Sequence, residues 1–244
     1  MRPSVEEMSA FYATPLGRRA VREVRRKLAP LLAQRATDRV LAVGYCGPYL
    51  DGFEGQPERL ALLMPARQGV MRWPSRPGAE GGAPAPNRAL LADETAMPFA
   101  DALFDQVIVI HGLEFVDPAR RLLLEIWRVL APNGRLLLVT SNRAGLWAHF
   151  ERTPFGNGRP YGRGQLASLL RESLFEPLSW QTALVMPPCG WLMPLESTAR
   201  TLAPNLGGIH IVLAQKTNGL VPVTPAPAKA LRRRASAPTS ASSL

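Results

Sequence analysis

The chain of 244 residues has little of what marks a disulfide-stabilised, metal-binding or membrane-spanning protein. Its two cysteines, Cys46 and Cys189, lie far apart, and its three histidines form no metal-binding motif. No uninterrupted apolar run approaches the roughly 20 residues of a membrane span. The first residues carry no apolar segment after a basic stretch, so we expect no secretory signal and a cytoplasmic protein. These absences exclude a transmembrane protein and argue against a disulfide framework or structural zinc.

The net charge of +10 is concentrated at the two ends of the chain. Residues 1–39 contain nine basic and four acidic side chains, and residues 216–244 contain five basic and no acidic ones. The residues between them are therefore electrically balanced. A basic protein often binds nucleic acid, but a balanced central part carries no such signal, so we do not expect a nucleic-acid partner.

Three segments follow from the residue pattern. Apolar residues recur at spacings of three and four within residues 1–37, which predicts an amphipathic helix from about residue 15 to residue 33. Residues 38–218 form the main domain. Residues 219–244 are rich in Pro, Ala and Ser and contain a run of three arginines, which predicts a disordered basic tail.

Short apolar runs alternate with helical patterns in the main domain. The predicted strands cover residues 39–44, 60–65, 104–110, 135–141 and 209–216. The predicted helices cover residues 118–130 and 162–175, and the Pro- and Gly-rich residues 75–87 predict no regular structure. This alternation predicts an α/β fold with a doubly wound, mostly parallel sheet and helices on both faces, a Rossmann-like arrangement.

Ligands of such a sheet bind beyond the carboxyl ends of its strands. The first predicted strand ends in VGYCGPYL, where Gly44 and Gly47 allow close approach of the backbone. A dinucleotide site requires G-x-G-x-x-G and an acid about 20 residues later. Here the glycines are spaced G-x-x-G, and the second strand ends in Met64 and Pro65. A hydride-transferring dehydrogenase is therefore disfavoured.

Three motifs follow one another in the middle of the chain: MPFADALFD, HGLEF and RVLAPNGR. Their order resembles class I S-adenosylmethionine-dependent methyltransferases, most closely the type 11 branch, over roughly residues 38–178. The resemblance implies methyl transfer with S-adenosylmethionine as cofactor. It implies that the glycine loop contacts the methionine part of the cofactor and that the acids before the first motif meet its adenine. The implied cofactor residues are Gly44, Tyr45, Cys46, Gly47, Asp93 and Glu94.

The chain departs from the family pattern at three places. Ala42 stands where the family usually has an acid, the loop reads G-Y-C-G-P instead of G-x-G-x-G, and Met64 and Pro65 replace the acid that holds the ribose. Asp93 also suits the cap of a short turn. Two hypotheses follow: a methyltransferase with an unusual cofactor grip, or a catalytically silent homologue that serves as a binding or regulatory partner of another protein.

Methyl transfer requires alignment of the acceptor, and a base only where a proton has to leave. His111, just past the third predicted strand, is the candidate base, and its alternative role is to hold a loop. Residues 141–170 combine aromatic and arginine side chains and predict either a lid over a small or apolar acceptor or a well-packed loop. The apolar residues 186–196 predict a part of the acceptor pocket or a dimer contact. The candidate substrate-binding residues are Glu114, Trp147, Phe155, Arg159 and Tyr161.

Overall fold

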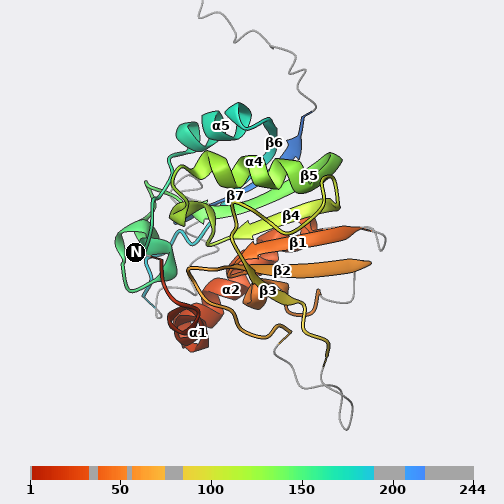
Figure 1. Ribbon diagram of the computed structural model, residues 1–244. Coiled ribbons are helices and arrows are strands. Elements are labelled where there is room, and N and C mark those ends of the chain that lie inside the picture. Colours follow the sequence, from red (N-terminus) through yellow and green to blue (C-terminus); the bar gives the residue numbers. More distant parts are fainter. Residues whose placement is uncertain (1, 33–37, 54–56, 75–84, 190–206, 218–244) are drawn as a thin grey trace, which may run out of the picture.

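A computed structural model describes residues 2–32, 38–53, 57–74, 85–189 and 207–217. Seven strands form one sheet in the order β3-β2-β1-β4-β5-β7-β6 (Figure 1). The strands are β1 Arg39–Gly44, β2 Arg59–Pro65, β3 Ala89–Ala92, β4 Phe104–Ile110, β5 Leu130–Ser141, β6 Phe175–Ala183 and β7 Ile209–Lys216. The first five run parallel, and β7 runs antiparallel to β5 and β6. The predicted doubly wound, mostly parallel α/β fold is confirmed.

Helices cover both faces of this sheet, with α1 and α2 on one side and α4 and α5 on the other (Figure 1). The helices are α1 Val5–Ala13, α2 Pro15–Leu28, α3 Gly47–Leu50, α4 Ala119–Val129 and α5 Arg163–Glu172. Short 3₁₀ turns are η1 Ala29–Leu31, η2 Leu113–Phe115, η3 Leu146–His149 and η4 Pro154–Gly156. Among the helices of the described residues, none is long and apolar enough to cross a membrane.

The helices on both faces of the sheet explain the apolar runs of the sequence. Val40 and Ala42 of β1 pack in the same cluster as the buried side chains of α2, whereas Leu41 and Val43 pack in the cluster that contains those of α4. Successive side chains of a strand point to opposite faces, so a strand covered on both faces needs apolar residues at nearly every position.

Two predicted helices end earlier than the sequence indicated. The helix expected over residues 15–33 ends at Leu28 and continues as the 3₁₀ turn η1, which contains Pro30, because a proline interrupts regular helical hydrogen bonding. The helix expected over residues 162–175 ends at Glu172. Leu174 then adopts a left-handed φ of 63°, and Phe175 already begins β6. The predicted tail 219–244 and residues 190–196 lie outside the described residues.

Four strands and helices were not expected from the sequence: β3, β6, α1 and the four-residue α3. Strand β3 has only four residues, and β6 alternates little between apolar and polar positions. Helix α1 starts with a capping box, in which Ser4 Oγ accepts from Glu7 N at 3.2 Å and Ser4 N donates to Glu7 Oε2 at 2.7 Å. The S-x-x-E signature at residues 4–7 was therefore a usable sequence signal for this helix.

The crossovers next to β2 contain little helix. Between β1 and β2 the described residues 45–53 and 57–58 contain only the four-residue α3, and the described residues 66–74 between β2 and β3 form no helix. Parallel strands are usually connected by a full helix that covers the sheet. Helix α2 and the buried ring of Trp73 pack in the apolar cluster on this face.

Candidate functional site

The carboxyl ends of the five parallel strands meet along one edge of the sheet, which we call the C-terminal edge. The residues that directly follow these strands are Tyr45, Ala66, Asp93, His111 and Asn142. Ligands of doubly wound sheets bind at this edge. The topology thus brings the predicted glycine loop, the predicted acids and the predicted base to one end of the molecule.

The glycine loop is held tightly against β4. Gly44 has a φ of 95°, and a Cβ at this position would lie 2.2 Å from the carbonyl oxygen of Ile110. Tyr45 N donates to that same oxygen at 3.0 Å. The Cys46 thiol donates to the Val43 oxygen at 3.2 Å, and burial raises its pKa to about 12, so it is a packed, neutral thiol. Gly44, Tyr45, Cys46 and Gly47 are all buried.

Helix α1 covers this loop through one side chain that the sequence analysis did not single out. The ring of Tyr12 stacks on the ring of Tyr45, with centroids 5.5 Å apart and planes at 11°. Its hydroxyl lies 2.7 Å from the Tyr49 hydroxyl and 2.5 Å from Nε2 of His111. At the other end of the helix, Val5 N donates to the Gln68 oxygen at 2.9 Å. Tyr12 therefore fills the space between the glycine loop and His111.

His111, the predicted base, lies behind Tyr12. It is 1% exposed, has a left-handed φ of 56°, and contacts the ring of Phe155 at a centroid distance of 4.6 Å. Burial lowers the pKa of His111 to about 3, so the imidazole is neutral at physiological pH. A neutral imidazole can accept a proton, and the hydroxyl of Tyr12 is the group that reaches its Nε2.

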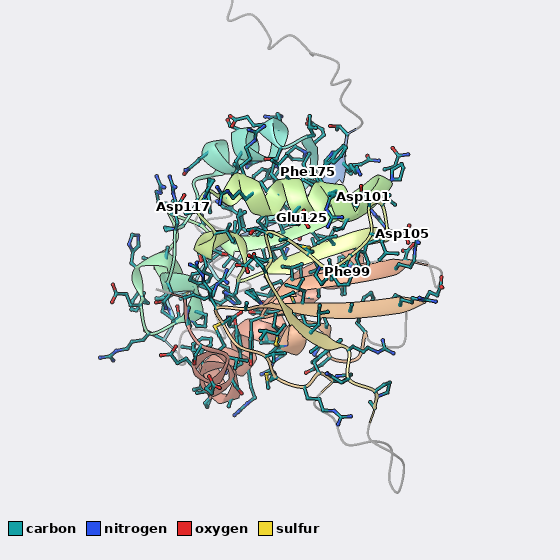
Figure 2. The ribbon with its side chains drawn as sticks, viewed as in Figure 1. Phe99, Asp101, Asp105, Asp117, Glu125 and Phe175 are labelled. Carbon is teal, nitrogen blue, oxygen red and sulfur yellow. The ribbon has the colours of Figure 1, made fainter. Side chains whose placement is uncertain are left out.

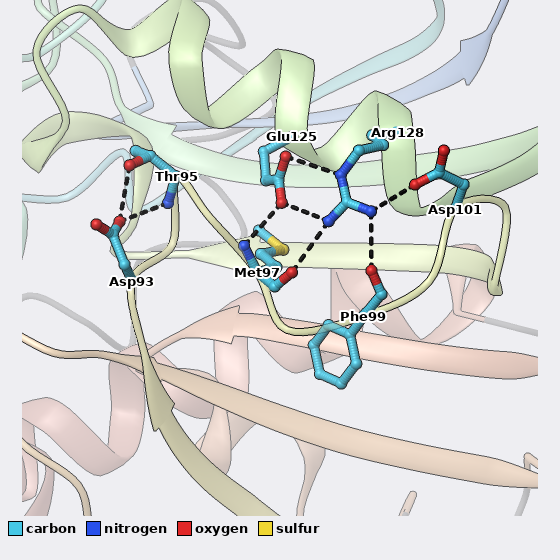
Figure 3. Close-up of polar contacts among 7 residues, drawn as sticks. All are labelled: Asp93, Thr95, Met97, Phe99, Asp101, Glu125 and Arg128. Atoms are coloured by element: carbon cyan, nitrogen blue, oxygen red, sulfur yellow. Dashed lines mark hydrogen bonds and ion pairs between the residues drawn. The ribbon is translucent and has the colours of Figure 1, made fainter.

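The two acids after β3 have different surroundings. Asp93 is exposed, and its Oδ1 accepts bonds from Thr95 N at 2.8 Å and from Thr95 Oγ1 at 2.7 Å (Figure 3). These bonds lower the pKa of Asp93 and make it the cap of the turn that follows β3. Glu94 is buried and pairs with Arg2 at 2.6 Å. The chain before α1 is thereby tied to the loop after β3.

That loop is fastened to α4 by the guanidinium of Arg128 (Figure 3). Arg128 donates to the carbonyl oxygens of Met97 at 3.0 Å and Phe99 at 2.8 Å. It also bonds both carboxylate oxygens of Glu125, at 3.0 and 2.6 Å, and Oδ1 of Asp101 at 2.6 Å. Glu125 in turn accepts from Met97 N at 2.7 Å. Residues of the motifs MPFADALFD and RVLAPNGR thus hold the loop that carries Asp93.

Asp105 belongs to the motif MPFADALFD but lies at the opposite edge of the sheet. It accepts bonds from the backbone N of Arg39 at 2.9 Å and from its Nε at 3.2 Å, which joins the starts of β1 and β4. In Figure 2, Asp105 and Asp117 lie at opposite ends of the molecule. Asp105 is therefore a structural residue, remote from the C-terminal edge.

Glu114 is a predicted site residue that lines a cavity at this edge. Its Oε1 accepts from Ser141 N at 2.9 Å, its backbone oxygen accepts from Arg159 N at 2.9 Å, and it is 5% exposed. Its Oε2 is buried. Burial raises the pKa of Glu114, and a contact with the side chain of Thr140 lowers this pKa by a smaller amount. The cavity has a volume of about 420 Å³ and is lined by Arg2, Arg67, Glu114, Phe115 and Gly158.

The aromatic residues of the segment after β5 are packed inside the protein. Trp147 is fully buried and donates from Nε1 to the Met186 oxygen at 2.6 Å. Phe155 lies between His111 and Trp147, and Tyr161 is 2% exposed and donates from N to the Ser141 oxygen at 3.0 Å. In this structure the segment is a well-packed loop, and its three predicted substrate-binding rings are core residues. Arg159 is exposed.

Comparisons of sequence place the chain near methyltransferases. A family model described as a methyltransferase domain matches residues 78–138. A demethylmenaquinone methyltransferase from Beutenbergia cavernae is 43% identical over 74 residues. This match covers 30% of the chain and 30% of that relative, so it spans well under two thirds of the relative's length.

Comparisons of structure give the same fold. An S-adenosylmethionine-dependent methyltransferase from Thermotoga maritima, described as a possible histamine N-methyltransferase, has a TM-score of 0.60 at 17% identity, covering 87% of this chain and 96% of that one. A putative methyltransferase solved in complex with a methyltransferase activator from Haloferax volcanii has a TM-score of 0.62 at 15% identity, covering 86% and 96%. At these identities the likeness is one of fold.

Proposed function

We propose that the chain is a class I S-adenosylmethionine-dependent methyltransferase and that it transfers a methyl group from this cofactor to a small or apolar acceptor at the C-terminal edge. The observation that carries the proposal is Glu114, a buried acidic residue that lines the 420 Å³ cavity at this edge. A sulfonium is positively charged, and a carboxylate in a poorly solvated place attracts it strongly.

The residues at this edge fit the cofactor in part. Asp93 offers an exposed, ionised carboxylate after β3, suited to an adenine amino group. Arg67 and Arg2 line the cavity beside Glu114 and suit the carboxylate of the methionine part, and the ring of Phe115 offers an apolar face. The cofactor, when bound, supplies the methyl group. The task of the chain is then to bind and align the acceptor.

The end of β2 does not fit in the same way, because Met64 and Pro65 offer no carboxylate to the ribose hydroxyls. Hydrogen bonds to a charged group contribute about 1.5–3 kcal/mol each. Their absence corresponds to an affinity roughly ten to a hundred times weaker than with the acid present. We therefore expect weak cofactor binding unless another group takes over this contact.

Proton removal, where the acceptor needs it, would run through Tyr12. Its hydroxyl lies 2.5 Å from Nε2 of His111, and Tyr12 lines a cavity next to the glycine loop, whereas His111 is buried behind it. Because burial lowers the pKa of His111 to about 3, it is a weak base. This favours an acceptor whose reacting atom needs little help in losing a proton.

One observation favours a catalytically silent protein as the second candidate. The rings of Tyr12 and Tyr45 stack over the glycine loop, and α1 packs along the edge where a cofactor would lie. A protein of this kind would use its methyltransferase fold to bind another protein. The match to the Beutenbergia relative covers 30% of that protein, so we do not transfer its acceptor to this chain.

Calorimetric titration of the full chain with S-adenosylmethionine and S-adenosylhomocysteine separates the two candidates. The methyltransferase proposal expects saturable binding of both ligands. Asp93→Ala should weaken both, whereas Asp117→Ala, which removes another exposed acid near this edge, should leave them unchanged. Absence of binding by both ligands at about millimolar concentration overturns the enzyme proposal and supports the silent one. Equal affinity of the two variants removes Asp93 from the site.

A further inference from the structure

A larger cavity, of about 600 Å³, lies beside the glycine loop on the face of the sheet that carries α2, and we call it the α2 cavity. Its volume is within the range of small-molecule sites in proteins. Tyr45 and Gly47 border it from the loop side. Its apolar lining consists of Val21, Met64, Met71 and Trp73, of which Met64 and Trp73 are almost fully buried.

The cavity has a clear origin in the fold. In most doubly wound sheets, full helices after β1 and β2 cover this face, but here α3 has four residues and the described residues 66–74 form no helix. The ring of Trp73 lies against the start of α3 instead, with its Cδ1 3.0 Å from where a Cβ of Gly47 would be. The described residues leave the space between this ring and α2 open.

Three arginines of α2 line the cavity from one side: Arg18, Arg22 and Arg25. Their spacing of four and three residues puts them on one face of the helix. All three are exposed, so they stand at the rim while the apolar residues form the floor. Long polar side chains at the rim of an apolar cavity keep their charged ends in water and facing the opening.

Among the described residues, no carboxylate forms an ion pair with these arginines. Arg18 donates to the carbonyl oxygen of Ala13, and Arg25 donates to the backbone oxygen of Asp51. Arg22 has no hydrogen bond or ion pair in the described part of the chain. The acid among the lining residues is Asp51, so the lining carries an excess of positive charge.

We propose that the α2 cavity binds a molecule with an apolar body and one anionic group, a carboxylate or a phosphate. The floor would bury the apolar body, and the guanidinium forks would hold the anionic group at the rim, where two parallel hydrogen bonds to one guanidinium are possible. Binding here does not depend on the proposed methyl transfer, although it places the ligand against the glycine loop.

Titration of the full chain with four probes of equal chain length tests this: dodecanoate, dodecyl phosphate, dodecanol and dodecyltrimethylammonium. We expect saturable binding of one molecule of at least one anionic probe, about tenfold or more tighter than dodecanol, and no measurable binding of the cation. The two anionic probes distinguish a carboxylate from a phosphate as the preferred group. Equal affinity for dodecanol and both anions, or no saturable binding of either anion, overturns the proposal.

Two matched variants locate the site. Arg22→Gln removes an exposed charge at the rim and should weaken binding of the tighter anion about tenfold while leaving dodecanol unchanged. Arg26 is an exposed arginine of the same helix that pairs with Glu23 at 2.5 Å and does not line the cavity. The variant Arg26→Gln should therefore bind the anion as tightly as the unmodified chain does. Circular dichroism checks that both variants fold. Equal loss in both variants, or none in Arg22→Gln, contradicts the assignment.

Discussion

Arg128 offers the sharpest test of how the loop after β3 is held, and we predict that Arg128→Met loosens it. The substitution keeps an unbranched apolar chain but replaces the guanidinium group. It therefore removes the donors to the carbonyl oxygens of Met97 and Phe99 and to both oxygens of Glu125. The two carbonyl groups and the carboxylate, whose side chain is 13% exposed, then lose their charged partner.

The size of the effect follows from counting the bonds that are shielded from water. The bond to Asp101 contributes little, because that side chain is 78% exposed. The bonds to the two carbonyl oxygens and the pair with Glu125 account for the rest of the effect. Each contributes about 1.5–3 kcal/mol to stability when shielded from water, and less when partly exposed. We expect a loss of about 3 kcal/mol in the free energy of unfolding, or roughly 6–12 °C in Tm for a chain of this size.

Urea unfolding and hydrogen exchange measure this prediction, with Arg121→Met as control. Arg121 is an exposed arginine of the same helix, so its replacement should change the free energy of unfolding by about 0.5 kcal/mol or less. Amides of residues 93–103 should exchange faster in Arg128→Met alone. Equal stability of the two variants, with unchanged exchange in that loop, would refute the reasoning.

The ion pair between Arg128 and Glu125 also predicts a pH dependence of the free energy of unfolding. The bonds from Arg128 lower the pKa of Glu125 below its ordinary value of 4.5. The stability this contributes is fully present above the unfolded pKa and is lost as the pH falls through the lower folded pKa. The difference in unfolding free energy between the unmodified chain and Arg128→Met should therefore be larger at pH 7 than at about pH 3.

Three further predictions concern the C-terminal edge. Burial lowers the pKa of His111 from 6.5 to about 3, so acidification below pH 6.5 favours the unfolded chain by up to about 1.4 kcal/mol per pH unit. The free energy of unfolding in urea should therefore fall less between pH 7 and pH 5 in His111→Gln than in the unmodified chain. Tyr12→Phe leaves Nε2 of His111 and the hydroxyl of Tyr49 without their shared partner and should cost about 1–3 kcal/mol by the same assay; no change would mean that water replaces the hydroxyl. Gly44→Ala places a Cβ 2.2 Å from the oxygen of Ile110 at a φ of 95°, so we expect a loss of more than about 2 kcal/mol, seen as a lower Tm, and an unchanged Tm would contradict the tight packing of the loop.

The sheet could be predicted from the sequence because its signals are local. The apolar runs that predicted strands at residues 39–44, 104–110 and 209–216 coincide with β1, β4 and β7, since a strand covered on both faces has to be apolar at almost every position. The motifs from residue 97 to residue 135 likewise indicated the fold correctly, and they lie within the residues that match a methyltransferase-domain family model. Strand β3, with four residues at the edge of the sheet, lacked such a signal.

The surroundings of the predicted site residues could not be read from the sequence. Nothing local distinguishes Tyr12 from a surface tyrosine, yet it bonds His111, 99 residues away, and covers the glycine loop. Trp147 and Phe155 looked like lid residues by composition, but their rings pack in the core with the buried residues of α1 and β1.

The sequence by itself therefore determined most of the strands and helices, the fold class and the edge at which we expect a ligand, because each depends on periodicity or on a short motif. The tertiary structure alone decided which of the candidate residues reach a cavity. Glu114 does so because η2 places it beside Arg2 and Arg67, whereas His111 is closed off by a helix from the other end of the chain. The arginines of α2 line a cavity because the described parts of the crossovers next to β2 contain only the four-residue helix α3.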